Sequence, residues 1–342
     1  AMLFLGVEIL SIPVYVLAAS NKTDLKSNES GFKYFIMGSV ASAILLFGIA
    51  FIYGATGSFD LATIASFYQG AEPVLLFNLG SLFIFIGFLF KISAAPFHIW
   101  TPDVYQGAPA LTTATMSTLA KVVAMAALYK LLTAMNVEIT YGFQIVIVVI
   151  SIASMTVGNI MALKQTNVKR MLAFSGISHA GFMLMALLSA TTAAGSLLYY
   201  ATAYSLAGIA AFTVLLYVCK DKENEEISHF NGLGKTNPIL AAVLTASLLS
   251  MAGIPVFAGF FAKLMLFTQT IESGYLIVVI AAVINSIISI GYYFKLILAM
   301  YTKDAAEEKQ ATPFVFYAVA VLAIIMNLVI GLYPTLILQL LS

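Results

Sequence analysis

Apolar runs of about 20 residues recur along the whole chain, and they restrict its fold more than any other feature. A membrane-spanning helix needs about 20 mostly apolar residues, because each residue advances about 1.5 Å through a hydrocarbon core of about 30 Å. By this rule we predict spans at residues 2–19, 31–53, 74–104, 110–134, 141–163, 168–190, 193–219, 238–271, 274–302 and 313–340. The chain is therefore predicted to be an all-α integral membrane protein with about ten transmembrane helices.

The composition agrees with lipid as the main solvent. Of the 342 residues, 61% are hydrophobic and 9% are charged, whereas a soluble domain has about 25% charged residues. The net charge of +1 argues against a nucleic-acid partner. The one cysteine, Cys219, excludes an internal disulfide and a multi-cysteine zinc or iron–sulfur site. We therefore predict no metal site and no cofactor site in this chain.

Two of the predicted spans, 74–104 and 238–271, are longer than one crossing requires. Each contains a proline among small residues, Pro96 in the first and Pro255 in the second. Proline removes a helix hydrogen bond and clashes with the preceding turn, so we predict that both helices are discontinuous. The two spans run in opposite directions and each carries a lysine near its break. Paired interrupted helices of this kind are typical of inverted-repeat transporters.

The charges in the loops predict the orientation of these spans. Basic residues gather on one side of the predicted membrane: Lys22, Lys26, Lys164, Lys169, Arg170, Lys220, Lys222, Lys235, Lys303 and Lys309. The other side has Lys130 beside the acidic residues Asp60, Glu72, Glu138 and Glu272. The positive-inside rule places the basic side in the cytoplasm. With an even number of spans, both ends of this chain would lie on the outer side.

Ionisable side chains are predicted near the middle of the membrane. Glu8, Lys121 and His179 each lie about 11 residues, or about 16 Å, from the basic end of their helices. Lys91 and Lys263 lie beside the helix breaks, where freed backbone groups favour a polar pocket. A charge at that depth costs about 3 kcal/mol, and intramembrane ionisable groups are functional by default. We predict that these residues share one central layer and transfer protons.

Structural interpretations stay open beside the functional ones. Glu8 could form an ion pair that neutralises one lysine and holds helices together, and a lone histidine can be a packing residue. Burial disfavours the charged form of lysine and a nearby carboxylate restores it, so Glu8 would control the charge of Lys91 if the two are in contact. Lys33 and Lys295 lie nearer the basic end, where their side chains can reach the interface. We regard both as candidate residues at a mouth of the proton path.

The residues around the first break resemble a known family. Residues 91–109, KISAAPFHIWTPDVYQGAP, resemble the signature of subunit N of bacterial proton-pumping NADH:quinone oxidoreductase, respiratory complex I. Further similar runs are LGVEILSIP (5–13), MALKQTNVKR (161–170), SGISH (175–179) and GFFAK (259–263). The alternative is a subunit of a multi-subunit cation/proton (Na⁺/H⁺) antiporter, which the run from Trp100 to Pro109 fits less well.

The resemblance implies a fold of fourteen helices with two inverted five-helix repeats, of which this chain would be the fifth to the fourteenth. About four N-terminal helices would then be missing. The chain would form a single polytopic membrane domain with three parts: the end of the first repeat (1–134), the second inverted repeat (135–302) and a C-terminal helix (303–342).

The resemblance also implies roles for the buried residues. Glu8 and Lys91 resemble the coupled glutamate–lysine pair of the first half-channel. Lys121 resembles the central connecting lysine and Lys263 the lysine of the second half-channel, and His179 is our candidate for the step between them.

The same resemblance implies an assembly around this chain. NADH, FMN, iron–sulfur clusters and quinone would be bound by partner subunits, and quinone would be reduced there. The direct partners would be antiporter-like sister subunits, small membrane subunits and the lipid of a bacterial inner (plasma) membrane. The chain is thus predicted to be a subunit of a proton-translocating enzyme that itself holds no redox centre.

Overall fold

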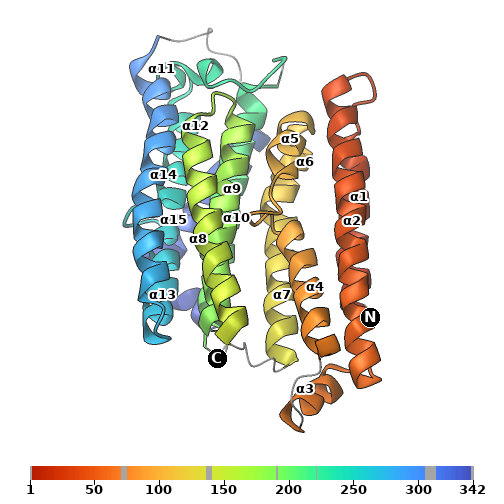
Figure 1. Ribbon diagram of the computed structural model, residues 1–342. Coiled ribbons are helices and arrows are strands. Elements are labelled where there is room, and N and C mark those ends of the chain that lie inside the picture. Colours follow the sequence, from red (N-terminus) through yellow and green to blue (C-terminus); the bar gives the residue numbers. More distant parts are fainter. Residues whose placement is uncertain are drawn as a thin grey trace.

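The computed structural model describes residues 2–70, 75–135, 141–189, 192–220, 222–304 and 313–339. Over these residues the regular secondary structure is helical, and the one β feature is an isolated bridge between Asn167 and Glu226. The long helices run side by side as one bundle (Figure 1). This confirms the predicted all-α class.

The first half of the bundle contains the first broken helix. Its elements are α1 (Met2–Ala18), α2 (Leu25–Thr56), α3 (Leu61–Gly70), α4 (Leu75–Lys91), α5 (Trp100–Gly107), α6 (Ala110–Thr115), the π-helical turn η1 (Met116–Ala120) and α7 (Lys121–Ala134). α4 and α5 are separated by a non-helical break, whereas α6, η1 and α7 follow one another as a continuous span. The short helix α3 lies at the opposite end of the bundle from the turn between α1 and α2 (Figure 1).

The second half contains the second broken helix. Its elements are α8 (Tyr141–Leu163), α9 (Val168–Leu184), the 3₁₀ turn η2 (Met185–Ser189), α10 (Ala194–Val218), the 3₁₀ turn η3 (Ile227–Phe230), α11 (Leu233–Thr236), α12 (Pro238–Ala252), α13 (Ala258–Glu272), α14 (Leu276–Thr302), α15 (Phe314–Leu332) and α16 (Thr335–Leu338). The break lies between α12 and α13, so both discontinuous helices are where the prolines predicted them.

The helices agree with the predicted spans. Within the described residues, seven spans are long and apolar enough to cross a membrane: α2, α6 to α7, α8, α9 with η2, α10, α14 and α15. The helices α1, α4 and α12 are apolar but shorter, and α4 and α12 are halves of the two broken spans. Glu72, Glu138 and Lys309, which contributed to the predicted orientation, lie outside the described residues.

Helix α9 lies at the centre of the bundle. Every residue of α9 except Arg170 is buried, and α5, α8 and α10 are among the helices packed against it. The Asn167 side chain caps the helix by accepting a hydrogen bond from the Arg170 backbone N–H at 3.0 Å, which defines where α9 begins. Because protein surrounds α9 on all sides, polar groups along it face other side chains rather than lipid.

Two glycines let α2 and α4 approach closely. A Cβ added at Gly48 would lie 2.8 Å from the Gly80 carbonyl oxygen, and one added at Gly80 would lie 2.9 Å from the Gly48 carbonyl oxygen. Small residues at such a crossing allow the helix backbones to touch. This contact fixes α4, and the lysine at its end, against α2.

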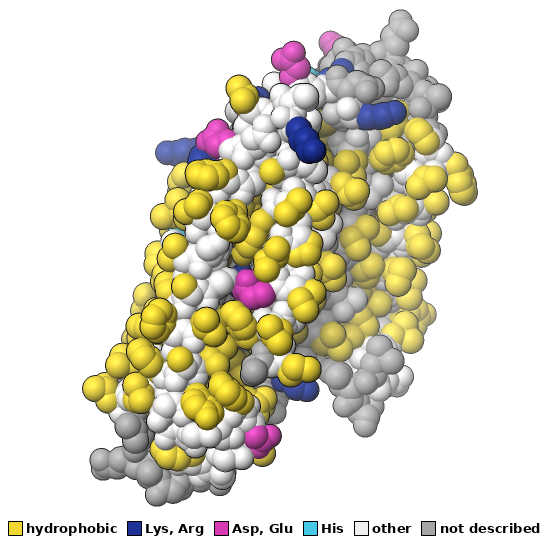
Figure 2. Space-filling model, turned by 90° about the vertical axis from the view of Figure 1, so that its right-hand side faces the viewer, with side chains coloured by type: hydrophobic (Ala, Val, Ile, Leu, Met, Phe, Trp, Pro, Cys, Tyr) yellow, Lys and Arg dark blue, Asp and Glu magenta, His cyan; other side chains and the backbone are white. Residues whose placement is uncertain are grey.

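Hydrophobic side chains cover the face formed by α1 and α2 (Figure 2). The exposed residues on α1 include Leu5, Ile9, Ile12 and Val16. Charged side chains in this view gather toward the two ends of the molecule, except for one acidic group at mid-height. A wide apolar belt between charged ends is the surface that a bilayer requires.

Candidate functional site

Glu8 of α1 and Lys91 at the end of α4 form an ion pair. The Nζ atom of Lys91 lies 3.1 Å from Oε1 of Glu8, and the two side chains are 4% and 15% exposed. The pair therefore lies inside the protein, with the carboxylate nearer the surface. Glu8 can therefore influence the charge of Lys91, because the two side chains are in direct contact.

Three hydroxyl groups complete the surroundings of the Lys91 ammonium. Its Nζ donates to Ser11 Oγ at 3.0 Å, to Tyr15 Oη at 3.2 Å and to Ser42 Oγ at 3.2 Å. Ser42 in turn donates to Oε1 of Glu8 at 2.7 Å. An ammonium group has three protons to donate, and here it faces four acceptors. It can therefore exchange one partner for another without losing all of its hydrogen bonds.

The backbone leaves helical geometry directly after Lys91. Ser93 has a φ of +64°, in the left-handed region that non-glycine residues seldom adopt. The Ala95 N–H donates to Ser154 Oγ of α8 at 2.9 Å, which ties the break to a neighbouring helix. The position of the lysine at the end of α4 is thus set by the break itself.

Lys121 begins α7 directly after the π-helical turn η1. It is 1% exposed, and among the described residues its Nζ has no hydrogen-bond partner. A Cβ added at Gly176 would lie 2.7 Å from this Nζ, so the ammonium occupies the space that the glycine leaves on α9. π-Helical turns are frequent at functional sites. The combination marks Lys121 as a group that is not held by a structural ion pair.

His179 of α9 lies between two tyrosine hydroxyls. Its Nδ1 is 2.7 Å from Tyr200 Oη and its Nε2 is 3.3 Å from Tyr293 Oη. Tyr293 also shares a hydrogen bond with Ser175 Oγ at 2.5 Å. A hydroxyl can both donate and accept, so this arrangement suits either tautomer of a neutral imidazole. The ring can therefore change its protonated nitrogen without losing its partners.

Lys263 of α13 lies at the second break and, in the described part of the chain, has no carboxylate partner. Its Nζ donates to the carbonyl oxygen of Ala252, the last residue of α12, at 2.8 Å. The same atom lies 4.7 Å from the centre of the Phe182 ring. Carbonyl groups at a helix C-terminus carry partial negative charge, and an aromatic face attracts a cation. Like the first break, this one contains a residue with positive φ, Val256 at +83°.

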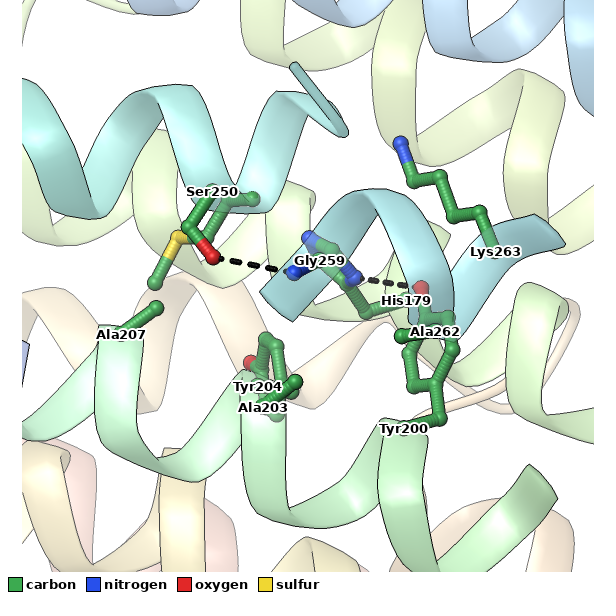
Figure 3. A pocket seen from close by; sticks show the side chains of 10 residues that line it. His179, Tyr200, Ala203, Tyr204, Ala207, Ser250, Gly259, Ala262 and Lys263 are labelled. Carbon is green, nitrogen blue, oxygen red and sulfur yellow. Dashed lines mark hydrogen bonds between the residues drawn. The ribbon is translucent and has the colours of Figure 1, made fainter. Parts of the chain in front are cut away.

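A cavity of about 10 Å³ lies between His179 and Lys263 (Figure 3). Figure 3 shows the hydrogen bond of His179 to Tyr200 on one side and that of the Gly259 N–H to Ser250 on the other. The volume is about what a single water molecule needs, and the lining supplies polar partners for it. The space between the two ionisable groups is therefore suited to one bridging water.

Three positions on α9 bring the buried groups into one row. Lys121 packs against Gly176 of α9, and His179 lies three residues further along this helix. Phe182, whose ring faces the Lys263 ammonium, lies three residues beyond His179. Residues three apart lie on the same face of a helix. We call Lys121, His179 and Lys263 the α9 row. The ion pair between α1 and α4 forms a second cluster with its own contacts. That the two clusters share one central layer of the membrane stays a prediction.

The two lysines predicted near the basic end have partners of their own. Lys33 lies 2.6 Å from Glu29 and 3.3 Å from Asp103. Lys295 is exposed and donates to the carbonyl oxygen of Gln165 at 2.9 Å. Lys33 thus forms ion pairs near the surface, and Lys295 donates a hydrogen bond to a backbone carbonyl after the end of α8. The role of either residue at a mouth of the path stays a prediction.

The sequence reasoning missed the hydroxyl groups that surround the charges. Ser11 and Tyr15 lie three and seven residues after Glu8, which is the spacing of one helical face, so this part could have been found. Tyr200 lies on α10, 21 residues after His179, and Tyr293 on α14, 114 residues after it, and no local pattern points to either contact. Among the described residues, no group of His, Cys, Asp and Glu is arranged to hold a metal ion.

The sequence matches known membrane subunits over its whole length. The pattern of the family described as NADH:quinone oxidoreductase/Mrp antiporter, TM, matches residues 1–289. The chain is 62% identical over 349 residues to NADH-quinone oxidoreductase subunit N of Flavobacterium johnsoniae, a match that covers 100% of this chain and 75% of that protein. It is 41% identical to the protein of the same name from Trichlorobacter lovleyi, covering 98% of this chain and 70% of that one.

Solved structures share the fold. A chain of respiratory complex I from Thermus thermophilus with bound Aureothin is 34% identical, with a TM-score of 0.86 over 98% of this chain and 74% of that one. A chain of the Mrp complex from Dietzia sp. DQ12-45-1b has a TM-score of 0.87 and is 23% identical, covering 98% of this chain and 72% of that one. At that identity the second likeness concerns the fold alone.

Proposed function

This chain belongs to the subunit N family of NADH-quinone oxidoreductase, and from that premise we propose how its residues move protons. It is a proton-translocating membrane subunit of that oxidoreductase. The buried groups described above are the ones available to carry the proton through the bundle.

The α9 row is the observation that carries the proposed route. A proton passes between Lys121 and Lys263 by way of His179 and the one-water cavity beside it. Each lysine can hold or release a proton, because burial opposes its charge while no carboxylate stabilises it. His179 passes a proton by taking it on one ring nitrogen and releasing it from the other.

The Glu8–Lys91 pair is proposed to control the first half of the route. While Glu8 contacts the ammonium, the charged form of Lys91 is stabilised. When the carboxylate turns away from Lys91 or takes a proton, the ammonium loses its negative partner and releases its own proton. The four acceptors around Nζ allow this exchange without an unsatisfied intermediate.

The assembly around the chain is proposed from the same family membership. NADH, FMN, iron–sulfur clusters and quinone are assigned to partner subunits, and the direct neighbours to antiporter-like and small membrane subunits. The exposed apolar side chains of α1 and α2 face lipid or such a neighbour. The membrane is assigned as a bacterial plasma membrane with the lysine-rich end of the bundle in the cytoplasm. The division at residues 134 and 302 into inverted repeats remains a prediction.

Lys91→Ala tests the proposed control pair. In the intact oxidoreductase in sealed vesicles, we expect this variant to assemble, to keep electron transfer and to lose most redox-driven proton uptake. Lys91→Arg should rescue poorly, because arginine keeps its charge in proteins. Lys235→Ala is the control, since that exposed lysine pairs with the exposed Asp304 and has no part in the proposed route. Normal pumping by an assembled Lys91→Ala complex would contradict the assignment, and sodium-dependent exchange without electron donor would support the antiporter alternative.

Cysteine labelling tests the proposed orientation. Cysteines replacing Lys26 and Lys222, at the lysine-rich end, should react with a membrane-impermeant reagent only from the cytoplasmic side. Cysteines replacing Asp60 and Glu272 should react only from the other side. Labelling in the opposite sense would reverse the topology.

A further inference from the structure

A larger cavity lies at the lysine-rich end of the bundle, away from the residues assigned above. Its volume is about 430 Å³. The turn between α1 and α2, the connection from α5 to α6, the start of α9, the end of α10 and the loop after α10 all line it. The cavity thus lies where the central helix begins, with charged residues in its wall.

Lys169 and Glu225 form an ion pair in this wall. The Nζ atom of Lys169 lies 2.7 Å from Oε1 of Glu225, and the side chains are 4% and 18% exposed. The same Nζ donates to the carbonyl oxygen of Ala108 at 2.9 Å. A buried ion pair adds little net stability, because desolvation offsets the attraction between its charges. The pair lies in the cavity wall at the first turn of the central helix α9, where both side chains can serve a function.

Backbone and side-chain bonds hold the Glu225 carboxylate in place. The Val168 N–H donates to the Glu225 carbonyl at 2.7 Å, so the loop is attached to the start of α9. The Asn167 side chain donates to Oε2 of Glu225 at 3.2 Å, while Oε1 faces Lys169. Both carboxylate oxygens are therefore engaged, and the group is pre-organised at the cavity wall.

The end of α5 connects this pair to the α9 row. Ala108, whose carbonyl accepts the bond from Lys169, follows α5. Tyr105 of α5 is fully buried near Ser117 and Tyr204, and its hydroxyl makes no hydrogen bond among the described residues. The hydroxyls of Ser117 and Tyr204 are 3.0 Å apart. Along α9, the distance from Lys169 to the glycine beside Lys121 is seven residues, or about 10 Å.

We propose that this cavity is the proton intake of the α9 row, with Glu225 as the acceptor and Lys169 as the group that passes the proton inward. The proposal rests on proton translocation by this chain. A proton from water in the cavity binds the Glu225 carboxylate, which leaves the Lys169 ammonium without a negative partner. Lys169 releases a proton toward the hydroxyls near Lys121 and regains one from Glu225. One proton has then moved inward, and both groups have their starting charges.

Other titratable groups around the cavity are less suited to this role. The charged residues facing it are Asp24, Lys26, Lys220, Lys222 and Glu223. Asp24 caps α2 through its bond to the Lys26 N–H at 2.9 Å, and Glu223 is exposed. Burial, and next the nearby Glu225 carboxylate, raise the pKa of the Cys219 thiol to about 12, so this thiol stays protonated. Glu225 is the carboxylate in the wall that combines burial with a lysine partner leading inward.

The first test compares two carboxylates of the same cavity in the intact oxidoreductase in sealed vesicles. Glu225→Gln should lower redox-driven pumping to the level of Lys121→Ala, whereas Glu223→Gln should pump as the unmodified complex does. If Lys121→Ala blocks pumping and assembled Glu225→Gln pumps normally, the intake proposal is wrong while the proposed route stands. If Lys121→Ala also pumps normally, the proposed route itself is wrong.

The second test separates a proton acceptor from a structural charge. Glu225→Cys in a Cys219→Ser background is modified with a thiol reagent that adds either a carboxylate or a sulfonate. Both restore a negative charge beside Lys169, but a sulfonate takes up no proton near neutral pH. Recovery of pumping with the carboxylate alone supports the proposal, and equal recovery with both overturns it. Complexes without the cysteine, treated with the same reagents, are the control.

A double variant covers the case in which single changes disrupt assembly. Removing one partner of a buried pair leaves an uncompensated charge and is strongly destabilising, whereas removing both avoids this penalty. The double variant Lys169→Gln/Glu225→Gln should therefore assemble and still lack intake. Normal pumping by this variant would show the pair to be structural and would overturn the proposal.

Discussion

The lysines at the two helix breaks occupy different surroundings although each lies at the same kind of backbone interruption. Lys91 faces a carboxylate and three hydroxyls, whereas the Lys263 ammonium faces one backbone carbonyl and an aromatic ring. A carboxylate stabilises a buried ammonium far more than a carbonyl dipole does. The first site is therefore suited to keeping its charge until Glu8 moves, and the second to releasing a proton readily.

This difference gives the two regions separate tasks within one protein. The paired site can respond to a change in a neighbouring charge, because Glu8 lies nearer the surface than Lys91. The unpaired site belongs to the α9 row, where the proton has a histidine and a one-water cavity beside it. The variants below test whether the presence of a carboxylate is what separates the two.

The largest effect is expected inside the α9 row. Lys121→Ala should lower redox-driven pumping by roughly a hundredfold, the lower end of what loss of a proton-transfer group costs. Adding His179→Ala should reduce it little further, because groups that act in series are not additive. The measurement is the pumping rate of both single variants and the double variant. Independent, multiplying losses would show that the two residues do not act in series.

An intermediate effect is expected from giving the second site the partner that it lacks. Met251 is buried and lines the cavity beside Lys263, so Met251→Glu places a carboxylate within reach of the ammonium. An added stabilisation of about 1.4 kcal/mol for the charged lysine would slow its release of a proton about tenfold.

The matched control for this change is Met251→Gln, which has nearly the same shape and no charge. It should pump close to the unmodified rate. If the two Met251 variants pump equally, a nearby carboxylate does not affect proton release by Lys263. The presence of a carboxylate would then not explain the different roles of Lys91 and Lys263.

The smallest effect is expected from Gly176→Ala. The added Cβ would lie 2.7 Å from Lys121 Nζ, so the flexible end of that side chain has to shift to make room. Small displacements of reacting groups slow transfer, so we expect a loss of about twofold to threefold in pumping rate. Gly158→Ala is the comparison, because its Cβ would meet the Ser178 backbone nitrogen at 2.6 Å and should lower stability instead. A Gly176→Ala complex with unchanged pumping but reduced stability would assign Gly176 to packing alone.

The class of the protein, its spans, the two helix breaks and the side chains that can carry charge inside the bundle could be predicted from the sequence. These properties are local. The length of an apolar run sets whether a helix can cross the bilayer, and a proline ends regular hydrogen bonding wherever it occurs in a helix. Lys121 and Lys263 could be recognised as candidates from the sequence, because a charged residue inside an apolar run is costly and therefore rare.

Which of these groups contact one another depends on how the helices pack in three dimensions. Glu8 and Lys91 are 83 residues apart, and their contact depends on how α1, α2 and α4 pack. The central position of α9, the tyrosines around His179 and the pairing of Lys169 with Glu225 likewise depend on helix rotation and on a loop bonded to a distant helix. A local pattern shows which face of a helix is polar, but the neighbour of that face is chosen by packing among helices that are far apart in the chain.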